Sequence, residues 1–180
     1  MVKPKVNIVA LTWNALEYTK ITLSRLLEST KAPFILTIID NASRKETIDF
    51  LKKIKSQGSC IKINKIFNQK NLGSGRAFNQ GWQISREEDI EFTCLINNDL
   101  YFSRGWLEAL LTEMEAPKIG AVAPIGVSQY SNYFDGMRNS RKVFEELNKD
   151  LSPQDELIDF FEGDLDRNMK KFCQSNTSQI

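Results

Sequence analysis

The segment FTCLINND (Phe92–Asp99) passes from an apolar run directly into two amides and a carboxylate, Asn97, Asn98 and Asp99. The apolar part is typical of a short buried strand, whereas Asn and Asp are common in turns. The polar end is therefore either a simple turn or a ligand site at the carboxyl end of a strand. The rest of the 180-residue chain has to decide between these two interpretations.

Similar apolar runs recur on both sides of this segment, separated by stretches with helical spacing. Strands are predicted at residues 6–11, 34–39, 61–67, 92–96 and 119–124, with 61–67 at an edge. Helices are predicted at residues 14–29, from Ser43 onward, at 73–85 and after Ser103, with Asn14 as the first cap and a capping box at 43–46. This alternation predicts an α/β fold, an open and mostly parallel sheet with helices on both faces.

The alternation defines a core at residues 1–125 and fades in residues 126–180. The net charge of +1 gives no reason to expect a nucleic-acid partner. No histidine is present, so a bound metal would need oxygen ligands, which favours Mg or Mn over Zn. The three cysteines are far apart and are expected to be reduced thiols, as in cytoplasmic proteins. No signal segment is recognised, and no apolar stretch approaches the ~20 residues of a membrane span.

Polar residues follow the first four predicted strands, at residues 12–14, 40–43, 68–76 and 97–99. Parallel strands bring their carboxyl ends to one edge of a sheet, where open α/β sheets bind ligands. Each cluster alone has an ordinary explanation, such as a turn and helix cap at residues 40–43. Four clusters on one edge favour a binding site.

Two nucleotide-binding patterns are excluded. Residues 12–16 contain no glycine, although a dinucleotide site requires a Gly-rich turn after the first strand. The chain also contains no GxxxxGK[ST] segment, so it has no P-loop.

Four segments resemble, in this order, the family 2 glycosyltransferases with the GT-A fold, especially their rhamnosyltransferase-like branch. The segments are VNIVALTWN, IIDNAS, NLGSGRAFNQG and LINND, which begin at Val6, Ile38, Asn71 and Leu95. The likeness covers roughly the first 125 residues. It implies that the ligand is a nucleotide-diphosphate sugar donor, with UDP or dTDP as the nucleotide.

The resemblance also implies roles for single residues. Asp40 would recognise the base, and Thr12 and Asn14 would lie against the nucleoside. Asp99 would hold Mg or Mn against the diphosphate, where the cation stabilises the charge that grows on the leaving group. Asn97 stands where an acid is usual, so we expect weaker metal binding than with two acids. The further nucleotide-sugar-binding positions are Asn41, Asn71, Gly73, Arg76, Asn97 and Asn98.

The catalytic base of the family lies in an acidic segment well after the metal motif. The best match here is FFEGDLDR at residues 160–167, in which Glu162 and Asp164 are the candidates. The competing interpretation is a solvated acidic helix end. Residues 126–180 would then form a shortened acceptor-side segment of the same domain.

The leading hypothesis is an inverting, metal-assisted glycosyltransferase that moves a sugar to a glycan, a lipid-linked acceptor or another hydroxyl in polysaccharide biosynthesis. We expect a cytoplasmic protein, with peripheral membrane association and the oligomeric state left open. One alternative is a nucleotide-sugar-binding module of the same fold without transferase activity, which covers a truncated or inactive form. Another is a partner-docking domain that uses residues 127–180 as its interface.

Overall fold

The computed structural model describes residues 4–124 of the chain. The chain divides into two compact units, Met1–Ala109 and Leu110–Ile180. The described sheet lies in the first unit, and of the second unit only residues 110–124 are described. The division predicted at residue 125 stays a prediction.

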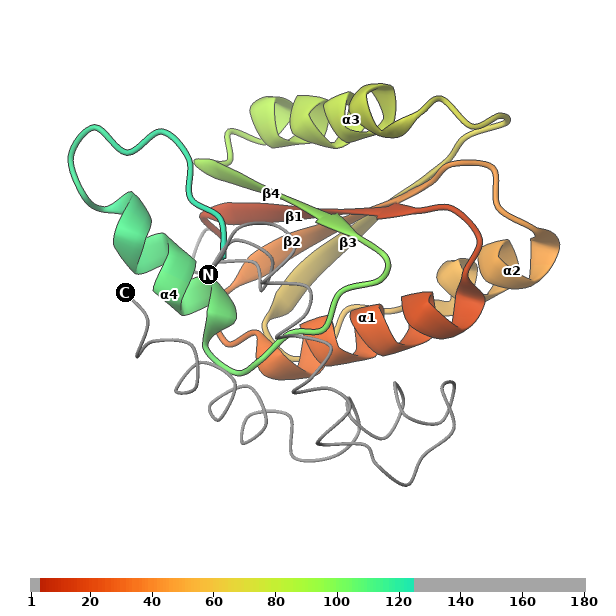
Figure 1. Ribbon diagram of the computed structural model, residues 1–180, viewed down its shortest axis with the longest axis horizontal. Coiled ribbons are helices and arrows are strands. Elements are labelled where there is room, and N and C mark those ends of the chain that lie inside the picture. Colours follow the sequence, from red (N-terminus) through yellow and green to blue (C-terminus); the bar gives the residue numbers. More distant parts are fainter. Residues whose placement is uncertain (1–3, 125–180) are drawn as a thin grey trace, which may run out of the picture. The chain divides into compact units, whose positions relative to one another are not determined.

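The first unit is built on a four-stranded parallel sheet in the order β3-β2-β1-β4 (Figure 1). The strands are β1 (Val6–Thr12), β2 (Phe34–Asp40), β3 (Cys60–Phe67) and β4 (Phe92–Asn97). In the register of the strands, Thr12 lies opposite Asp40, and Leu11 lies opposite Asn97. The open parallel sheet and the edge position of β3 confirm the prediction, and the ends of β1, β2 and β4 reach one edge together.

Helices cover both faces of this sheet (Figure 1). They are α1 (Leu16–Ser29), α2 (Lys45–Lys53) and α3 (Ser74–Glu87), and a further helix, α4 (Trp106–Met114), follows β4 in the chain. α3 lies on one face, and α1 and α2 lie on the other. Every residue of β1 and β2 is buried, because a central parallel strand has a helix on each side.

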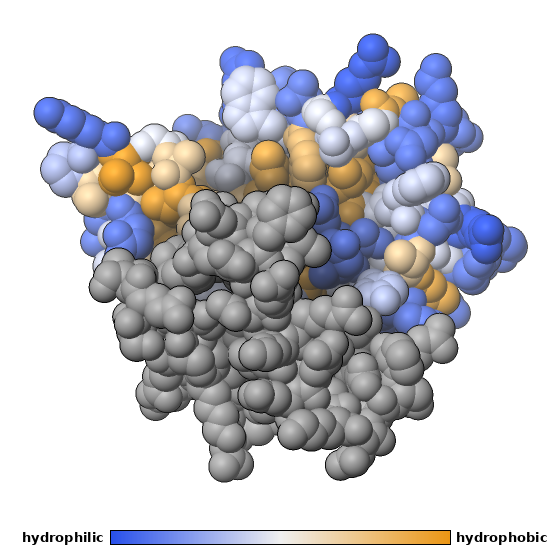
Figure 2. All heavy atoms as spheres, viewed as in Figure 1, coloured by the Kyte–Doolittle hydropathy of each residue, from blue (hydrophilic) through white to orange (hydrophobic). Residues whose placement is uncertain are grey.

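α3 approaches the sheet closely through a glycine. A Cβ atom at Gly81 would lie 2.2 Å from Cγ1 of Val9, so only glycine fits at this helix position. Val9, Leu11, Ile39 and Ala77 form the apolar cluster beneath the helix. In the space-filling view, apolar side chains show below α3 and hydrophilic ones cover its outer surface (Figure 2).

The predicted helix caps at Asn14 and Ser43 are wrong. α1 begins after Ala15 and α2 begins after Arg44, and neither start has a side-chain cap. The reason is that the two polar side chains bond across to each other's loop. The backbone N–H of Asn14 donates to Ser43 Oγ (2.7 Å), and Asn14 Oδ1 accepts from the backbone N–H of Arg44 (2.8 Å).

The strand predicted at residues 119–124 is also absent from the described structure, where this stretch forms no strand pairing. The apolar run there is not buried, and Ile119 is 44% exposed. An apolar run becomes a strand only where a neighbouring strand accepts its backbone hydrogen bonds. Among residues 4–124, no helix combines the length and apolar character that a membrane crossing needs.

Candidate functional site

The last residues of β1 and β2, Thr12 and Asp40, each carry a buried polar side chain. Thr12 and Asp40 are both 0% exposed, and they are paired in the strand register. Residues at such positions are ~4.8 Å apart in neighbouring strands, with side chains on the same face. Asp40 Oδ2 accepts from the backbone N–H of Ser43 (3.1 Å). Thr12 Oγ1 and Asp40 Oδ1 have no hydrogen-bond partner among residues 4–124.

These unpaired atoms point to a ligand that supplies the missing partners. A buried polar group without a partner costs about 1–3 kcal/mol, so native structures contain few of them. A ligand with adjacent donor and acceptor atoms can bond to a carboxylate and a hydroxyl together. The edge of a nucleotide base has this chemistry.

Asn14 joins the loops that follow three strands. In addition to its bonds to the loop after β2, its backbone oxygen accepts from Asn98 Nδ2 (3.2 Å), in the loop after β4. Its backbone has a left-handed conformation with a φ of 55°, which Asn tolerates better than most residues. The backbone N–H, the backbone oxygen and Oδ1 of Asn14 are thus all engaged in holding loops together.

Asn41 has the same kind of role between the loops after β2 and β3. It is 2% exposed, and its Nδ2 donates to Asn71 Oδ1 (2.8 Å). Its Oδ1 accepts from the backbone N–H of Leu72 (3.0 Å) and from Asn68 Nδ2 (3.3 Å). Asn71 Oδ1 also accepts from the backbone N–H of Gly73 (2.8 Å). Asn41 therefore fixes the loop that leads into α3.

The start of α3 is open and suited to an anion. Gly73 precedes the helix with a φ of 76°, and a Cβ atom there or at Gly75 would meet nothing within 4 Å. Arg76 is exposed in the first turn, and this turn contains no acidic residue. The N-terminus of a helix carries partial positive charge, which favours phosphate groups.

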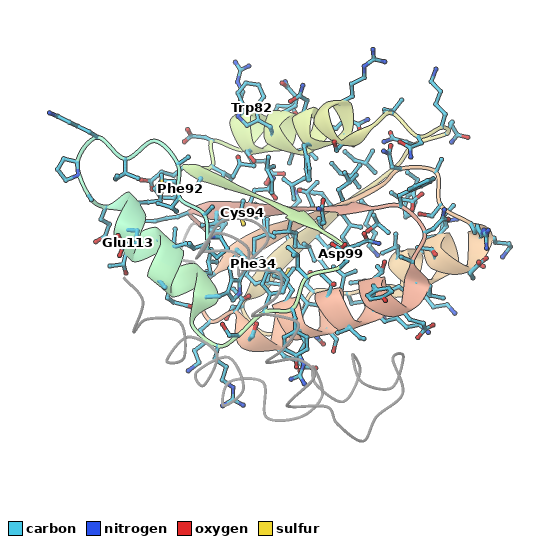
Figure 3. All side chains as sticks on the ribbon, viewed as in Figure 1. Phe34, Trp82, Phe92, Cys94, Asp99 and Glu113 are labelled. Atoms are coloured by element: carbon cyan, nitrogen blue, oxygen red, sulfur yellow. The ribbon has the colours of Figure 1, made fainter. Side chains whose placement is uncertain are left out.

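The segment Asn97–Asp99 alternates between solvent and protein. Asn97 and Asp99 are exposed, whereas Asn98 is half-buried and donates from Nδ2 to Thr19 Oγ1 on α1 (2.8 Å). Figure 3 shows Asp99 beyond the end of β4, between this strand and α1. The segment therefore serves as a turn anchored by Asn98 and also presents a carboxylate and an amide to solvent.

The oxygen ligands at this corner fit Mg or Mn, but they are few. Residues 4–124 contain no group of three or more His, Cys, Asp or Glu that could hold a metal. The carboxylate of Asp99 and the amide oxygen of Asn97 are hard ligands of the type these ions prefer. Such a site needs further ligands from water or from the phosphates of a substrate.

The structure thus brings the predicted residues of the four strand ends to one edge of the sheet, and their individual roles stay predictions. Glu162 and Asp164 lie outside the described residues. Sequence reasoning missed Thr19 and Thr22, which are buried on α1 and bond to the loop after β4. The available signal was the presence of two threonines three residues apart on the face that carries the buried leucines.

The open parallel sheet with helices on both faces defines a class of fold, the GT-A fold of solved glycosyltransferases. PcManGT, a mannosyltransferase from Pyrobaculum calidifontis solved with GDP-Man and Mn2+, matches with a TM-score of 0.61 and 16% identity, over 76% of this chain and 39% of that chain. TarS 1–349 from S. aureus, solved with UDP-GlcNAc, matches with a TM-score of 0.53 and 18% identity, over 68% of this chain and 38% of that chain.

The family model described as glycosyl transferase family 2 matches residues 7–168, and the chain belongs to that family. This confirms the family and the fold that the four segments predicted. No curated protein sequence matches the chain. The chain spans about two fifths of the length of these two solved structures, 39% of PcManGT and 38% of TarS 1–349.

Proposed function

We propose that this chain binds a UDP- or dTDP-sugar together with Mg or Mn and transfers the sugar, with inversion, to a hydroxyl acceptor. The observation that supports this most directly is that two buried atoms, Thr12 Oγ1 and Asp40 Oδ1, have no hydrogen-bond partner within residues 4–124. They lie at the same edge of the sheet as the exposed Asp99. The family match supports transfer, and the complexes of the structural neighbours with UDP-GlcNAc and GDP-Man support a nucleotide-sugar donor.

In this proposal, Asp40 and Thr12 recognise the base. The imide N–H of uracil or thymine would donate to Asp40 Oδ1, because a carboxylate accepts hydrogen bonds strongly. Thr12 Oγ1 would donate to the neighbouring base carbonyl. Asn14 and Asn41 would act on the donor through the loops they hold, since their described hydrogen bonds run to protein atoms.

At the diphosphate, Asp99 and Asn97 would hold Mg or Mn, which supplies charge stabilisation of the leaving group when bound. Arg76 and the free N–H groups at the start of α3 offer further positive charge at the same sheet edge. Asn71 and Gly73 set the path of the chain into this helix. Mn bound in the structural neighbour PcManGT supports the choice of a divalent ion.

The residues proposed to act on the acceptor lie outside residues 4–124, the part of the chain that the structure describes. Glu162 and Asp164 remain the proposed bases that would take the proton from an acceptor hydroxyl. The proposed acceptor is a glycan or a lipid-linked glycan in polysaccharide biosynthesis, with peripheral association at the membrane. The cytoplasm remains the proposed compartment, supported by the unpaired thiols of Cys60 and Cys94.

Calorimetric titration with UDP, dTDP and GDP, each with and without Mn, tests donor binding. We expect UDP or dTDP to bind, with Mn raising the affinity and Asp99→Asn abolishing the effect of Mn. Asp49 on α2, a half-buried acid that pairs with Lys45, provides a control, since Asp49→Asn should bind like wild type. Absence of binding by all three nucleotides, or binding indifferent to Asp99, would contradict the proposal.

Donor binding without transfer is the second candidate function. In support of it, each polar group of the described strand ends holds a loop or belongs to the proposed donor side, and Glu162 and Asp164 are not among the described residues. Release of free sugar from UDP- and dTDP-sugars, followed by chromatography, separates the two. Slow hydrolysis that is lost in Asp164→Asn or Glu162→Gln supports an enzyme, and tight binding without any hydrolysis supports the module.

A further inference from the structure

Thr22 on α1 holds the backbone on both sides of Asp99. Its hydroxyl oxygen lies 2.9 Å from the backbone oxygen of Asn98 and 2.8 Å from that of Leu100, so its proton can be donated to either. The same oxygen accepts from the backbone N–H of Leu100 (3.1 Å). One hydroxyl group thereby ties both peptide neighbours of Asp99 to the helix.

Thr19, one turn earlier on α1, holds the same loop through a side chain. Its hydroxyl accepts from Asn98 Nδ2 (2.8 Å) and donates to the backbone oxygen of Ala15 (3.0 Å). Residues three apart lie on the same side of a helix. Thr19 and Thr22 are buried, and both hydroxyl groups already bond to protein atoms.

Two buried threonines are an unusual choice for this helix face. Threonine has a lower helix propensity than leucine or alanine, and valine has a similar shape without the hydroxyl. The neighbouring inward positions are apolar, with Leu23, Leu26 and Leu27 buried. The two hydroxyl groups therefore contribute mainly to holding the loop after β4 and less to stabilising the helix.

The loop needs this support because Asp99 provides the carboxylate of the proposed metal corner, and residues 4–124 contain no group of three or more His, Cys, Asp or Glu that could hold the ion. With an amide at Asn97 in place of a second acid, the protein offers few strong ligands, and their position matters more. Groups that orient a metal ligand from behind commonly change metal affinity by about 10- to 100-fold when removed. We propose that Thr19 and Thr22 are positioning residues that hold Asp99 in place for the metal and diphosphate. This inference rests on the proposed function.

The test is the effect of Mn on nucleotide affinity in Thr22→Val and Thr19→Val. We expect the gain in UDP or dTDP affinity caused by Mn to fall about 10-fold or more in each variant, with metal-free affinity unchanged. Thr22→Ser keeps the hydroxyl and should restore the gain. Direct titration of Mn by electron paramagnetic resonance, without sugar donor or turnover, gives a second readout.

Thr37→Val is the matched control, because Thr37 is also fully buried and donates a hydrogen bond, to Asn7 Oδ1 (2.8 Å), in the middle of the sheet. It should lower the melting temperature while the effect of Mn stays as in wild type. A Thr22→Val protein that keeps the full effect of Mn, or loses affinity equally with and without Mn, overturns the inference alone. A wild-type protein that binds neither nucleotide nor Mn overturns the proposed function and the inference with it.

Discussion

At the scale of single residues, Thr12 and Asp40 differ from the other polar groups of the strand ends. Asn14, Asn41 and Asn98 bond to other loops, whereas Thr12 Oγ1 and Asp40 Oδ1 have no partner within residues 4–124. A fold that keeps a buried carboxylate oxygen unpaired gives up stability, and a ligand that bonds to this oxygen restores it. In the proposed function, Thr12 Oγ1 and Asp40 Oδ1 are therefore the atoms expected to contact the base.

Replacing Asp40 separates binding from stability. In Asp40→Asn, an amide keeps an acceptor for the backbone N–H of Ser43 but removes a buried negative charge. We expect the ligand-free protein to be as stable as wild type or more stable, and nucleotide affinity to fall about 10- to 100-fold, as for loss of a charged hydrogen bond. Thermal unfolding and calorimetry measure the two effects.

The matched change is Asp49→Asn, at a carboxylate on α2 that pairs with Lys45 at the surface. This variant should leave nucleotide affinity unchanged. Unaltered affinity in Asp40→Asn would show that the buried carboxylate does not contact the ligand.

At the scale of elements, amide side chains set the positions of the loops. Asn41 fixes the loop before α3, Asn68 and Gln80 exchange two hydrogen bonds of 2.9 Å, and Asn14 joins the loops after β1, β2 and β4. These bonds hold loops that carry no regular backbone pairing of their own. The sheet brings the strand ends to one edge, and these side-chain hydrogen bonds then fix the loops that follow the strands.

Asn41→Ala should loosen the loop that leads into α3. The backbone N–H of Leu72 loses its acceptor, so we expect faster hydrogen exchange in residues 68–73 than in wild type. Exchange in β2 should stay as slow as in wild type. Exchange followed by mass spectrometry of peptides measures this. Asn79→Ala, at an exposed position of α3, is the control and should show wild-type exchange. Unchanged protection of the loop in Asn41→Ala would contradict its role.

The contact between α3 and β1 yields a second prediction at this scale. Gly81→Ala places a Cβ atom 2.2 Å from Cγ1 of Val9, so the helix has to move. We expect a loss of about 1–3 kcal/mol in the free energy of unfolding, which urea titration measures. Adding Val9→Ala should recover part of the loss by removing the clashing methyl groups.

The control for this prediction lies on the same helix. Gly75→Ala adds its Cβ atom to open space, with no heavy atom within 4 Å, and should stabilise the helix by about 0.5–1 kcal/mol. Equal effects of the two substitutions would mean that helix propensity, and not the contact with Val9, decides the outcome.

At the scale of the whole molecule, one sheet organises the described part of the chain. The strand order β3-β2-β1-β4 places the four polar segments at the same edge of the sheet. The buried residues of β1 and β2 stabilise this sheet. Burial also affects titration. It raises the pKa of the Cys60 thiol and of the Cys94 thiol to about 11 from an ordinary value of 9.0.

These thiols predict a loss of stability at alkaline pH. In the unfolded chain they lose their protons near pH 9, earlier than in the folded protein, where the pKa is about 11. The unfolded state therefore binds fewer protons between these values, and the free energy of unfolding falls as pH rises from about 9 to 11. The upper limit is about 1.4 kcal/mol per pH unit for each thiol.

Urea unfolding of wild type and of the Cys60→Ala, Cys94→Ala double variant over this range measures the effect. The double variant should lose less stability as pH rises. Burial lowers the pKa of Lys65, which acts in the opposite direction, but it is present in both proteins and cancels in the comparison. Parallel pH profiles for the two proteins would contradict the prediction.

Much of the fold could be read from the sequence, because apolar runs such as Val6–Thr12 and Phe34–Asp40 are local patterns. Parallel pairing then follows from the alternation with helices, whereas the full strand order, β3-β2-β1-β4, was not predicted. The helix starts at Asn14 and Ser43 were predicted wrongly, since a cap is also a local pattern but both side chains bond to a loop about 30 residues away. The strand predicted at residues 119–124 does not form, because no described strand pairs with this segment.

By itself, the sequence determined the family, the parallel sheet and the edge on which its polar residues gather, because these depend on short-range periodicity and on the order of motifs. Only the tertiary structure decided which polar side chains hold the loops and that Thr12 Oγ1 and Asp40 Oδ1 have no partner within residues 4–124. Asn98 reaches Asn14 across 84 positions of the chain, and Thr22 reaches Leu100 across 78. Contacts over such separations depend on how the fold brings the start of α1 to the loop after β4, which no local pattern encodes.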